Sequence, residues 1–124
     1  MIPIIFNTRD EFIKVDIEKM VYALAEDNYV QMVFLNGQKA LVCTSLNSLE
    51  RLILSVLRKE QYGSYTRIGR SLIVNNAYIT HINLPKQHLV LSDLDTIKPI
   101  VLSVPKAALK VLKTTLLESN KKQS

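Results

Sequence analysis

The sequence predicts a mostly β fold with two short-to-medium helices, in which short turns join the strands into antiparallel sheets. Over most of the chain, apolar residues alternate with polar ones or form runs rich in β-branched and aromatic residues, as strands do. Near residues 46–57 and 108–117, apolar residues instead recur every three or four positions, the period of an amphipathic helix. The order is about four strands, a helix, about four strands and a helix. Helix and strand alternate too rarely for a Rossmann-type fold.

The N-terminal part begins with a lead-in over residues 1–11, where Pro3 and a polar cluster argue against a long element. Within the lead-in, residues 4–6 could add an edge strand. From residue 12 the pattern is that of a half-buried strand, because apolar residues 13, 15 and 17 alternate with charged ones. A second apolar run follows at residues 20–25, and the turn-prone side chains of residues 26–28 interrupt it. The predicted domain covers residues 12–118, and residues 119–124 form a polar, basic tail that we expect to be disordered.

A hairpin is predicted next. Residues 29–35 are rich in β-branched and aromatic side chains and are expected to form a strand. Asn36-Gly37 follows, a pair that accepts positive φ at both central positions of a tight turn. Residues 38–44 are the expected return strand.

The first helix has two candidate starts. Thr44 and Ser45 offer hydroxyl caps, whereas Asn47 and Glu50 stand in the spacing of a capping box two residues later. Gly63 is the expected end. The apolar stripe consists of Leu46, Leu49, Leu52, Ile53, Val56 and Leu57.

Strands resume at Tyr65, and a turn that carries Arg67 and Arg70 leads into the apolar run Leu72–Val74. Ser103 is placed to cap the second helix, with Pro105 in its first turn, where proline is tolerated. The further strands are expected at residues 78–84, 88–91 and 100–102.

Composition indicates one domain with a substantial core, because 48% of the 124 residues are hydrophobic. No apolar run approaches the ~20 residues that a membrane-spanning helix needs. The N-terminus lacks the basic region of a signal peptide. The single cysteine, Cys43, lies in an apolar run, so we expect a buried thiol and no disulfide. These features favour the reducing cytoplasm.

Positive charge is concentrated in the second half. Residues 1–60 hold seven Lys and Arg against eight Asp and Glu, whereas residues 61–124 hold nine against three. One-sided positive charge attracts phosphate groups by steering and counterion release. An ordinary basic surface would explain the charge equally well.

Catalytic patterns are weak, so we expect no enzyme activity, metal or cofactor. His81 and His88 lie seven residues apart with no third ligand at metal spacing. Three glycines leave no room for a glycine-rich phosphate loop.

Nucleic-acid binding fits the residues better. Arginine can grip phosphate or read guanine with its two-pronged side chain. No helix-turn-helix pattern is present, since neither helix follows another at short spacing. Tyr29 and Tyr65 flank turns and could stack on bases, although ordinary strand packing explains them too. The candidate cations of the basic half are Arg67, Arg70, Lys98, Lys106, Lys110 and Lys113.

Four segments in this order resemble the LytTR family of bacterial DNA-binding domains. VYALAEDNYVQMVFLNGQ is similar to the opening pair of strands, and SLNSLERLI to the Ser-Leu segment with its helix. YTRIGRSLIVNNAYITHI is the most specific match, and IVLSVPKAALKVL resembles the closing strand, serine and helix. The resemblance runs from about Phe12 to Leu117. It implies an elongated stack of small antiparallel sheets whose loops, in place of a recognition helix, enter successive major grooves.

The resemblance also implies which residues contact DNA and where this chain departs from its relatives. Gly69 stands where the family often has histidine, and Val104 and Pro105 separate the closing serine from its first charge, which favours a phosphate contact for Lys106. Carried over by position, the DNA-binding residues are Asn28, Tyr29, Arg67, Arg70, Ser71, Ser103, Lys106 and Lys110.

The expected function is sequence-specific binding of double-stranded DNA by a transcriptional regulator similar to the output domain of a two-component response regulator. No receiver domain can be placed in the chain, so a stand-alone module is expected. Paired direct repeats are the expected target, bound by a homodimer on DNA or with a separate signalling protein. The alternative is a protein-interaction module that keeps the fold but has lost DNA binding.

Overall fold

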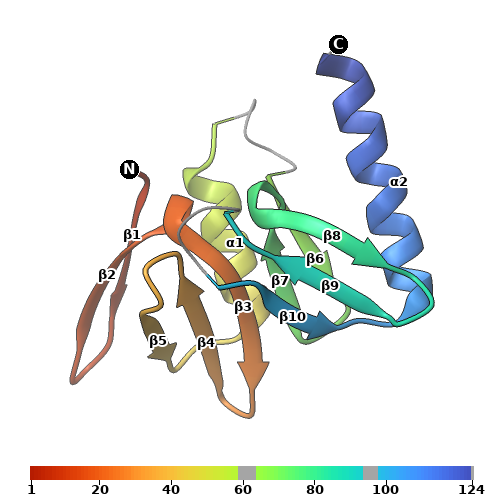
Figure 1. Cartoon of the computed structure of the whole chain (residues 1–124). Helices are drawn as coiled ribbons and strands as arrows, with labels where there is room; N and C mark the ends of the chain where they lie inside the picture. The colour runs from red at the N-terminus through yellow and green to blue at the C-terminus, as the bar shows by residue number, and fades with distance from the viewer. Residues whose placement is uncertain (59–63, 94–97, 124) are drawn as a thin grey trace. The chain divides into compact units, whose positions relative to one another are not determined.

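The structure is a computed structural model that describes residues 1–58, 64–93 and 98–123, with the backbone alone for residues 119–123. The chain forms two compact units, Met1–Asn75 and Asn76–Ser124 (Figure 1). The predicted fold class is confirmed, because the described residues form three antiparallel sheets and two α-helices.

The first unit holds one two-stranded sheet, β1-β2, and one five-stranded sheet in the order β5-β4-β3-β7-β6. Its strands are β1 (Pro3–Asn7), β2 (Phe12–Asp16), β3 (Met20–Glu26), β4 (Tyr29–Phe34), β5 (Lys39–Val42), β6 (Tyr65–Ile68) and β7 (Leu72–Asn75). Its helices are the 3-10 turn η1 (Ile17–Lys19) and α1 (Leu46–Val56).

The N-terminal lead-in contains a strand, as its apolar residues allowed. β1 pairs with β2 along its whole length, from Pro3 opposite Asp16 to Asn7 opposite Phe12. Ile4 and Phe6 are buried while Ile5 between them is exposed, because successive side chains of a strand point to opposite faces. The hairpin thereby adds two side chains to the core of the first unit.

The hairpin predicted at Asn36-Gly37 is confirmed, although its loop is longer than a two-residue turn. The last pair of β4 and β5 is Val33 opposite Lys39. Of the two residues, only Gly37 has positive φ, at 86°. Asn36 acts through its side chain instead, since its Oδ1 accepts a hydrogen bond from the Gln38 amide at 3.0 Å.

Helix α1 uses the first of its two candidate starts. The Ser45 hydroxyl accepts a hydrogen bond from the Ser48 amide at 3.0 Å, so Ser45 is the N-cap. The helix ends at Val56, before the predicted end at Gly63, which lies outside the described residues. The earlier end follows from Leu57, which adopts an extended conformation and is buried in the core.

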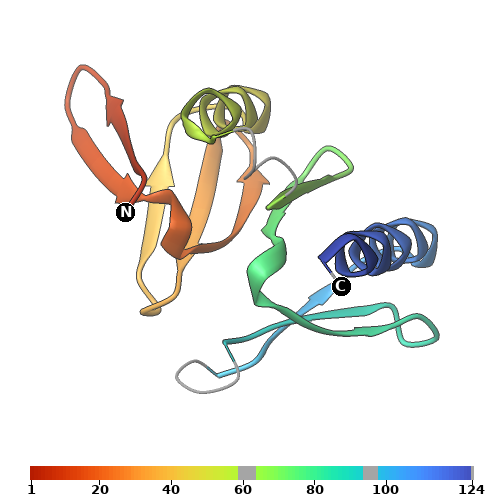
Figure 2. The ribbon, with the colours of Figure 1, turned by 90° about the horizontal axis from the view of Figure 1, so that it is seen from above.

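The core of the first unit lies between α1 and one face of the five-stranded sheet (Figure 2). Strand β7 is buried along its whole length, and Ile73 is its member in this core. The other large side chains of the core are Ile4, Phe6, Ile17, Met20, Val30, Met32, Val42, Leu46, Leu49, Ile53 and Leu57.

The second unit is a three-stranded sheet in the order β10-β9-β8 with one α-helix. Its buried side chains include Leu89 and Leu91 of the central strand and Leu109 and Leu112 of the helix. The elements are the 3-10 turn η3 (Asn76–Tyr78), β8 (Ile79–Asn83), β9 (His88–Leu91), β10 (Ile100–Ser103) and α2 (Lys106–Gln123).

The prediction that Ser103 caps the second helix is wrong. Ser103 is the last residue of β10, and the Pro105 carbonyl accepts the first helical hydrogen bond, from the Leu109 amide at 3.0 Å. The chain stays extended past Ser103 because Val104 is buried and its amide donates to the Gln87 carbonyl at 3.1 Å. Helix α2 includes residues 119–123, and the disorder of that tail stays a prediction.

The prediction of a buried thiol is also wrong, because Cys43 is exposed. On edge strand β5 the burial alternates, with Leu41 exposed and Val42 buried, so the next side chain points outward again.

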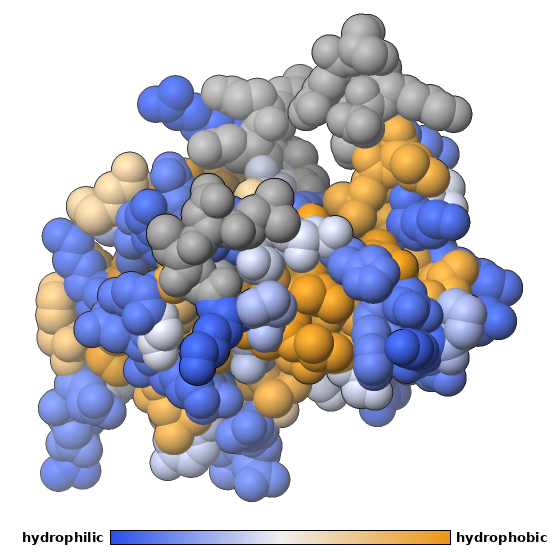
Figure 3. Space-filling model, viewed as in Figure 1, coloured by the Kyte–Doolittle hydropathy of each residue, from blue (hydrophilic) through white to orange (hydrophobic). Residues whose placement is uncertain are grey.

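Apolar areas also lie among the hydrophilic side chains of the face drawn in Figure 3. None of the described helices is long and apolar enough to cross a membrane.

Candidate nucleic-acid interface

Three connections of the first unit meet at one end of the five-stranded sheet (Figure 1). The β3–β4 turn closes at Glu26 opposite Tyr29. The β6–β7 turn lies beside it, because β3 pairs with β7 up to Leu24 opposite Leu72, and the Ala25 amide then donates to the Ser71 carbonyl at 2.8 Å. The β5–α1 connection is at the same end, since Val42 lies opposite Val30. Strand register thus unites segments that are far apart in the sequence.

The β3–β4 turn presents Asn28 and Tyr29, as the sequence predicted for a turn. The two-residue loop depends on Asp27, which has a φ of +51°, a conformation that Asp tolerates better than most residues. Asn28 is exposed, and Tyr29 keeps 45% of its surface accessible. Neither side chain forms a hydrogen bond within the part of the chain that the structure describes.

The β6–β7 turn presents Arg70 and Ser71. Ile68 lies opposite Leu72, so Gly69, Arg70 and Ser71 form the loop. All three are exposed. The guanidinium of Arg70 makes no hydrogen bond or ion pair with any described residue, which leaves its donors available to a ligand.

Gly69 is required by backbone conformation. Its φ is +61°, while a Cβ at this position would meet nothing within 4 Å. Replacing Gly69 by alanine is therefore expected to lower the free energy of unfolding by about 1 kcal/mol through backbone strain alone. Gly69→Asn should cost less, because asparagine tolerates this region. Chemical denaturation of both variants checks the order, and equal stability of all three proteins would contradict it.

Arg67 lies beneath the same turn and is occupied by contacts within the protein. Its side chain is 22% exposed. Nε donates to the Gly69 carbonyl at 2.8 Å, and one terminal nitrogen donates to Asn47 Oδ1 at 3.0 Å and Glu50 Oε1 at 3.3 Å. The structure therefore joins Arg67 to two α1 residues that the sequence had suggested only as helix caps. Both side chains lie on one face of α1, because the two residues are three positions apart.

Acidic residues offset the arginine charge at this sheet end. Glu26 and Asp27 are exposed on the β3–β4 turn, and Glu50 neutralises Arg67. Burial, together with the nearby Glu26 carboxylate, raises the pKa of the Tyr22 phenol. Arg70 is thus the one arginine of this sheet end, among described residues, without a carboxylate partner.

In the second unit, Ser103 and Lys106 lie near the β8–β9 turn. Ser103 is opposite His88, the first residue after that turn, and both Ser103 and Lys106 are exposed. Lys110 is exposed one helical turn beyond Lys106. The register brings Lys86, an exposed residue of the β8–β9 turn, to the same end of the sheet. Sequence reasoning placed a turn there but did not include Lys86 among the candidate cations.

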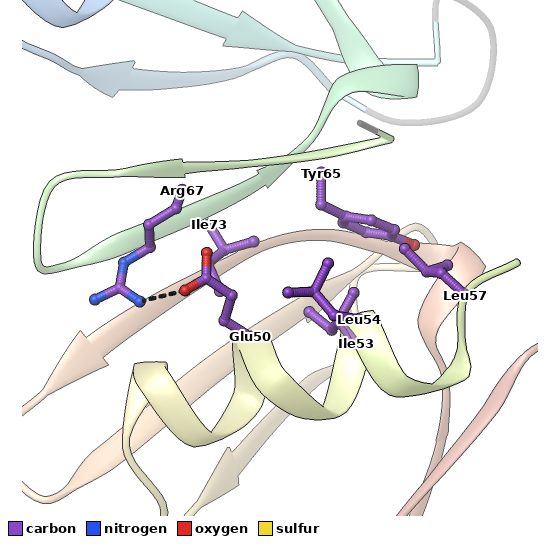
Figure 4. Close-up of a pocket in the computed structure, with 7 residues that line it drawn as sticks. All are labelled: Glu50, Ile53, Leu54, Leu57, Tyr65, Arg67 and Ile73. Atoms are coloured by element: carbon purple, nitrogen blue, oxygen red, sulfur yellow. Dashed lines mark hydrogen bonds and ion pairs between the residues drawn. The ribbon is translucent and has the colours of Figure 1, made fainter. Parts of the chain in front are cut away.

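A cavity of about 40 Å³ lies between α1 and β6–β7 (Figure 4). Arg67 and Glu50 meet at one side of it, and Tyr65, Ile53 and Ile73 line the rest. The Tyr65 hydroxyl donates a hydrogen bond to the Ile17 carbonyl at 2.6 Å. A cavity of this volume has room for a few water molecules at most, so we assign no small-molecule site to it.

No group of His, Cys, Asp and Glu among the described residues could hold a metal ion. His81 and His88 lie on adjacent strands, opposite Val90 and Asn83. Neither histidine is therefore the cross-strand partner of the other.

The profile of the LytTR DNA-binding domain matches residues 10–116. This chain belongs to the LytTR family. One similar solved structure is the LytTR DNA-binding domain from Bacillus cereus assigned to a methyl-accepting/DNA response regulator, at 24% identity and a TM-score of 0.62. The match covers 94% of this chain and 97% of that one, and it shows a shared fold. A search of curated proteins finds no match.

Membership in the LytTR family implies DNA binding in transcription regulation, by a non-catalytic domain of the kind that serves as a response-regulator output module. The resemblance predicted from four segments is therefore confirmed over nearly the whole chain. The absence of enzyme activity expected from the sequence agrees with the family.

Proposed function

We propose that this LytTR domain binds double-stranded DNA sequence-specifically as a cytoplasmic bacterial transcriptional regulator, with its turns entering successive major grooves. The main support is the meeting of the β3–β4 and β6–β7 turns at one sheet end. There, Asn28, Tyr29, Arg70 and Ser71 are exposed, and their side chains have no partner among the described residues. Unsatisfied donors on a protruding turn suit the edges of base pairs.

Base readout and phosphate contact fall to different residues in this proposal. Arg70 reads guanine through its paired donors, and Asn28 or Tyr29 contacts a neighbouring base edge. Acidic Glu26 and Asp27 beside them disfavour phosphate, which supports a base-facing role for the β3–β4 turn. The phosphate contacts are assigned to Ser71, Ser103, Lys106 and Lys110.

Two copies on paired direct repeats are the proposed assembly, either as a homodimer formed on DNA or with a separate signalling protein. Selection from a random duplex pool tests the function directly. Enrichment of one motif, and a Kd that rises steeply with salt, are the expected results. Absence of any enriched motif, together with salt-independent binding, would contradict the proposal.

Replacing Lys106 by alanine is expected to weaken binding to all duplexes alike and to flatten the log Kd against log salt plot by about one unit. The reason is the loss of one phosphate contact without loss of base readout. Lys14→Ala, on the exposed face of the β1–β2 hairpin, removes the same charge at a residue outside the proposed contacts and is the matched control. Equal salt slopes for both variants would exclude the Lys106 contact.

A protein-interaction module is the second candidate, favoured by the carboxylates of Glu26, Asp27 and Glu50 at the sheet end. Edge strands such as β5 could pair with a strand of a partner chain. Under this alternative, the Glu26→Gln and Asp27→Asn variants gain no affinity for DNA. Under DNA binding they gain non-specific affinity, because two negative charges near the phosphates are removed.

A further inference from the structure

The guanidinium of Arg67 donates to four acceptors, which come from two elements. Besides Gly69, Asn47 and Glu50, the second terminal nitrogen lies 3.4 Å from the Arg70 carbonyl. All three guanidinium nitrogens thus have a partner within the protein. These four bonds leave at most one of the five guanidinium N–H groups for a phosphate, and Glu50 would repel that phosphate.

The four acceptors belong to two parts of the protein, two in helix α1 and two in the β6–β7 turn. Asn47 and Glu50 belong to the first turns of α1, which is anchored in the core through Leu46 and Leu49. The other two acceptors are the carbonyls of Gly69 and Arg70, in the β6–β7 turn itself. The guanidinium therefore links the backbone of a protruding turn to a packed helix. Figure 4 shows its ion pair with Glu50 of that helix.

We propose that Arg67 is a positioning residue that fixes the β6–β7 turn, with Asn47 and Glu50 orienting its guanidinium, so that Arg70 and Ser71 are presented in one geometry for base readout. This inference rests on the proposed DNA-binding function and departs from the sequence prediction that Arg67 itself contacts DNA. Gly69 at positive φ leaves the turn with a flexible residue, and the two carbonyl contacts offset that freedom.

A charge-conserving variant separates positioning from phosphate contact. Arg67→Lys keeps the positive charge but cannot serve acceptors in several directions from one planar group. With the full chain and the duplex enriched from the random pool, Arg67→Lys is expected to lose about tenfold in specific affinity. Its affinity for a scrambled duplex, and its salt slope, should stay as in the wild type. If Arg67→Lys binds the enriched duplex like the wild type, the proposal is overturned and Arg67 is a phosphate contact.

Variants of Asn47 and Glu50 give a second test, because the positioning role and a phosphate contact of Arg67 predict opposite changes in affinity. Glu50→Ala and Asn47→Ala are expected to lower specific affinity by several-fold, although Glu50→Ala also removes a negative charge from the DNA-binding surface. If Arg67 were a phosphate contact held back by Glu50, the same variant would raise affinity for every duplex. Arg51→Ala, one residue further along α1 and exposed, is the matched control and should leave the specificity ratio unchanged.

The rigidity of the turn backbone can be measured without DNA, and it tests whether Arg67 positions the turn. NMR order parameters of Gly69 to Ser71 are expected to fall from roughly 0.85 to below about 0.6 in Arg67→Lys, at a temperature where the variant is folded. Unchanged order parameters overturn the inference even where no duplex is enriched. If no duplex is enriched from the random pool while Arg67→Lys still loosens the turn, the proposed function fails and the positioning contact stands.

Discussion

Replacing Ile73 by alanine is expected to lower the free energy of unfolding by about 2–5 kcal/mol. Ile73 is 1% exposed, lies in β7 between β3 and β6, and packs against α1. Its side chain borders the cavity of about 40 Å³, so truncation enlarges a void that already exists. The cost exceeds the transfer free energy of the lost carbons, because a strand paired on both sides cannot collapse into the gap.

Urea denaturation measures this effect through the midpoint, with the slope m expected to stay constant. Ile73→Val removes one carbon and should cost about 0.5–1.5 kcal/mol. Val101→Ala, on a strand residue that is 55% exposed, should change stability by less than about 0.5 kcal/mol. If Ile73→Ala unfolds at the midpoint of the Val101→Ala variant, the side chain of Ile73 is not buried in the core.

The elements that the sequence predicted correctly depend on interactions between residues that are close together in the chain. The Asn36-Gly37 hairpin follows from turn chemistry, and the α1 stripe from a period that sequence alone displays. Ser45 as N-cap follows from hydroxyl capping, although the Asn47 alternative was equally consistent with the residues. In each case the deciding interaction joins residues fewer than six positions apart.

The predictions that failed depend on partners far away in sequence. The buried thiol was wrong because an apolar run on edge strand β5 has one face outward, and only sheet order reveals that β5 is an edge. The prediction that Ser103 caps the second helix was wrong because the Val104 amide donates to the Gln87 carbonyl, which keeps the chain extended past Ser103. Local patterns contain neither fact.

The candidate site shows the same division. Turns were predicted at Asn28-Tyr29 and around Arg67, Arg70 and Ser71, although Arg67 lies in β6 and the second turn is residues 69–71. The meeting of the two turns at one sheet end follows from the pairing of β3 with β7. The contacts of Arg67 with Asn47 and Glu50 span 20 and 17 residues, so no spacing rule could have found them. The sequence thus predicted the parts of this site but not how register assembles them.

Replacing Arg70 by alanine is expected to have the largest effect on DNA recognition, a loss of about 1–3 kcal/mol in specific binding. Arg70 is exposed on the β6–β7 turn, and its side chain has no partner in the described part of the chain. Because this guanidinium forms no hydrogen bond or ion pair with a described residue, the free energy of unfolding should be unchanged. Base preference should relax at one position of the selected motif, since a single pair of donors is removed.

Arg9→Ala is the matched control for this loss. Arg9 lies in the β1–β2 loop, outside the β3–β4 and β6–β7 turns, with a side chain that is 96% exposed, so its removal subtracts the same charge from a different loop. Both variants should lose some non-specific affinity through net charge, but only Arg70→Ala should change which sequences are selected from a random pool. Identical motifs from the two variants would mean that Arg70 contacts phosphate and that base readout belongs to the β3–β4 turn. Reading the motif position that relaxes then shows which base pair the β6–β7 turn reaches, a distinction that affinity alone cannot make.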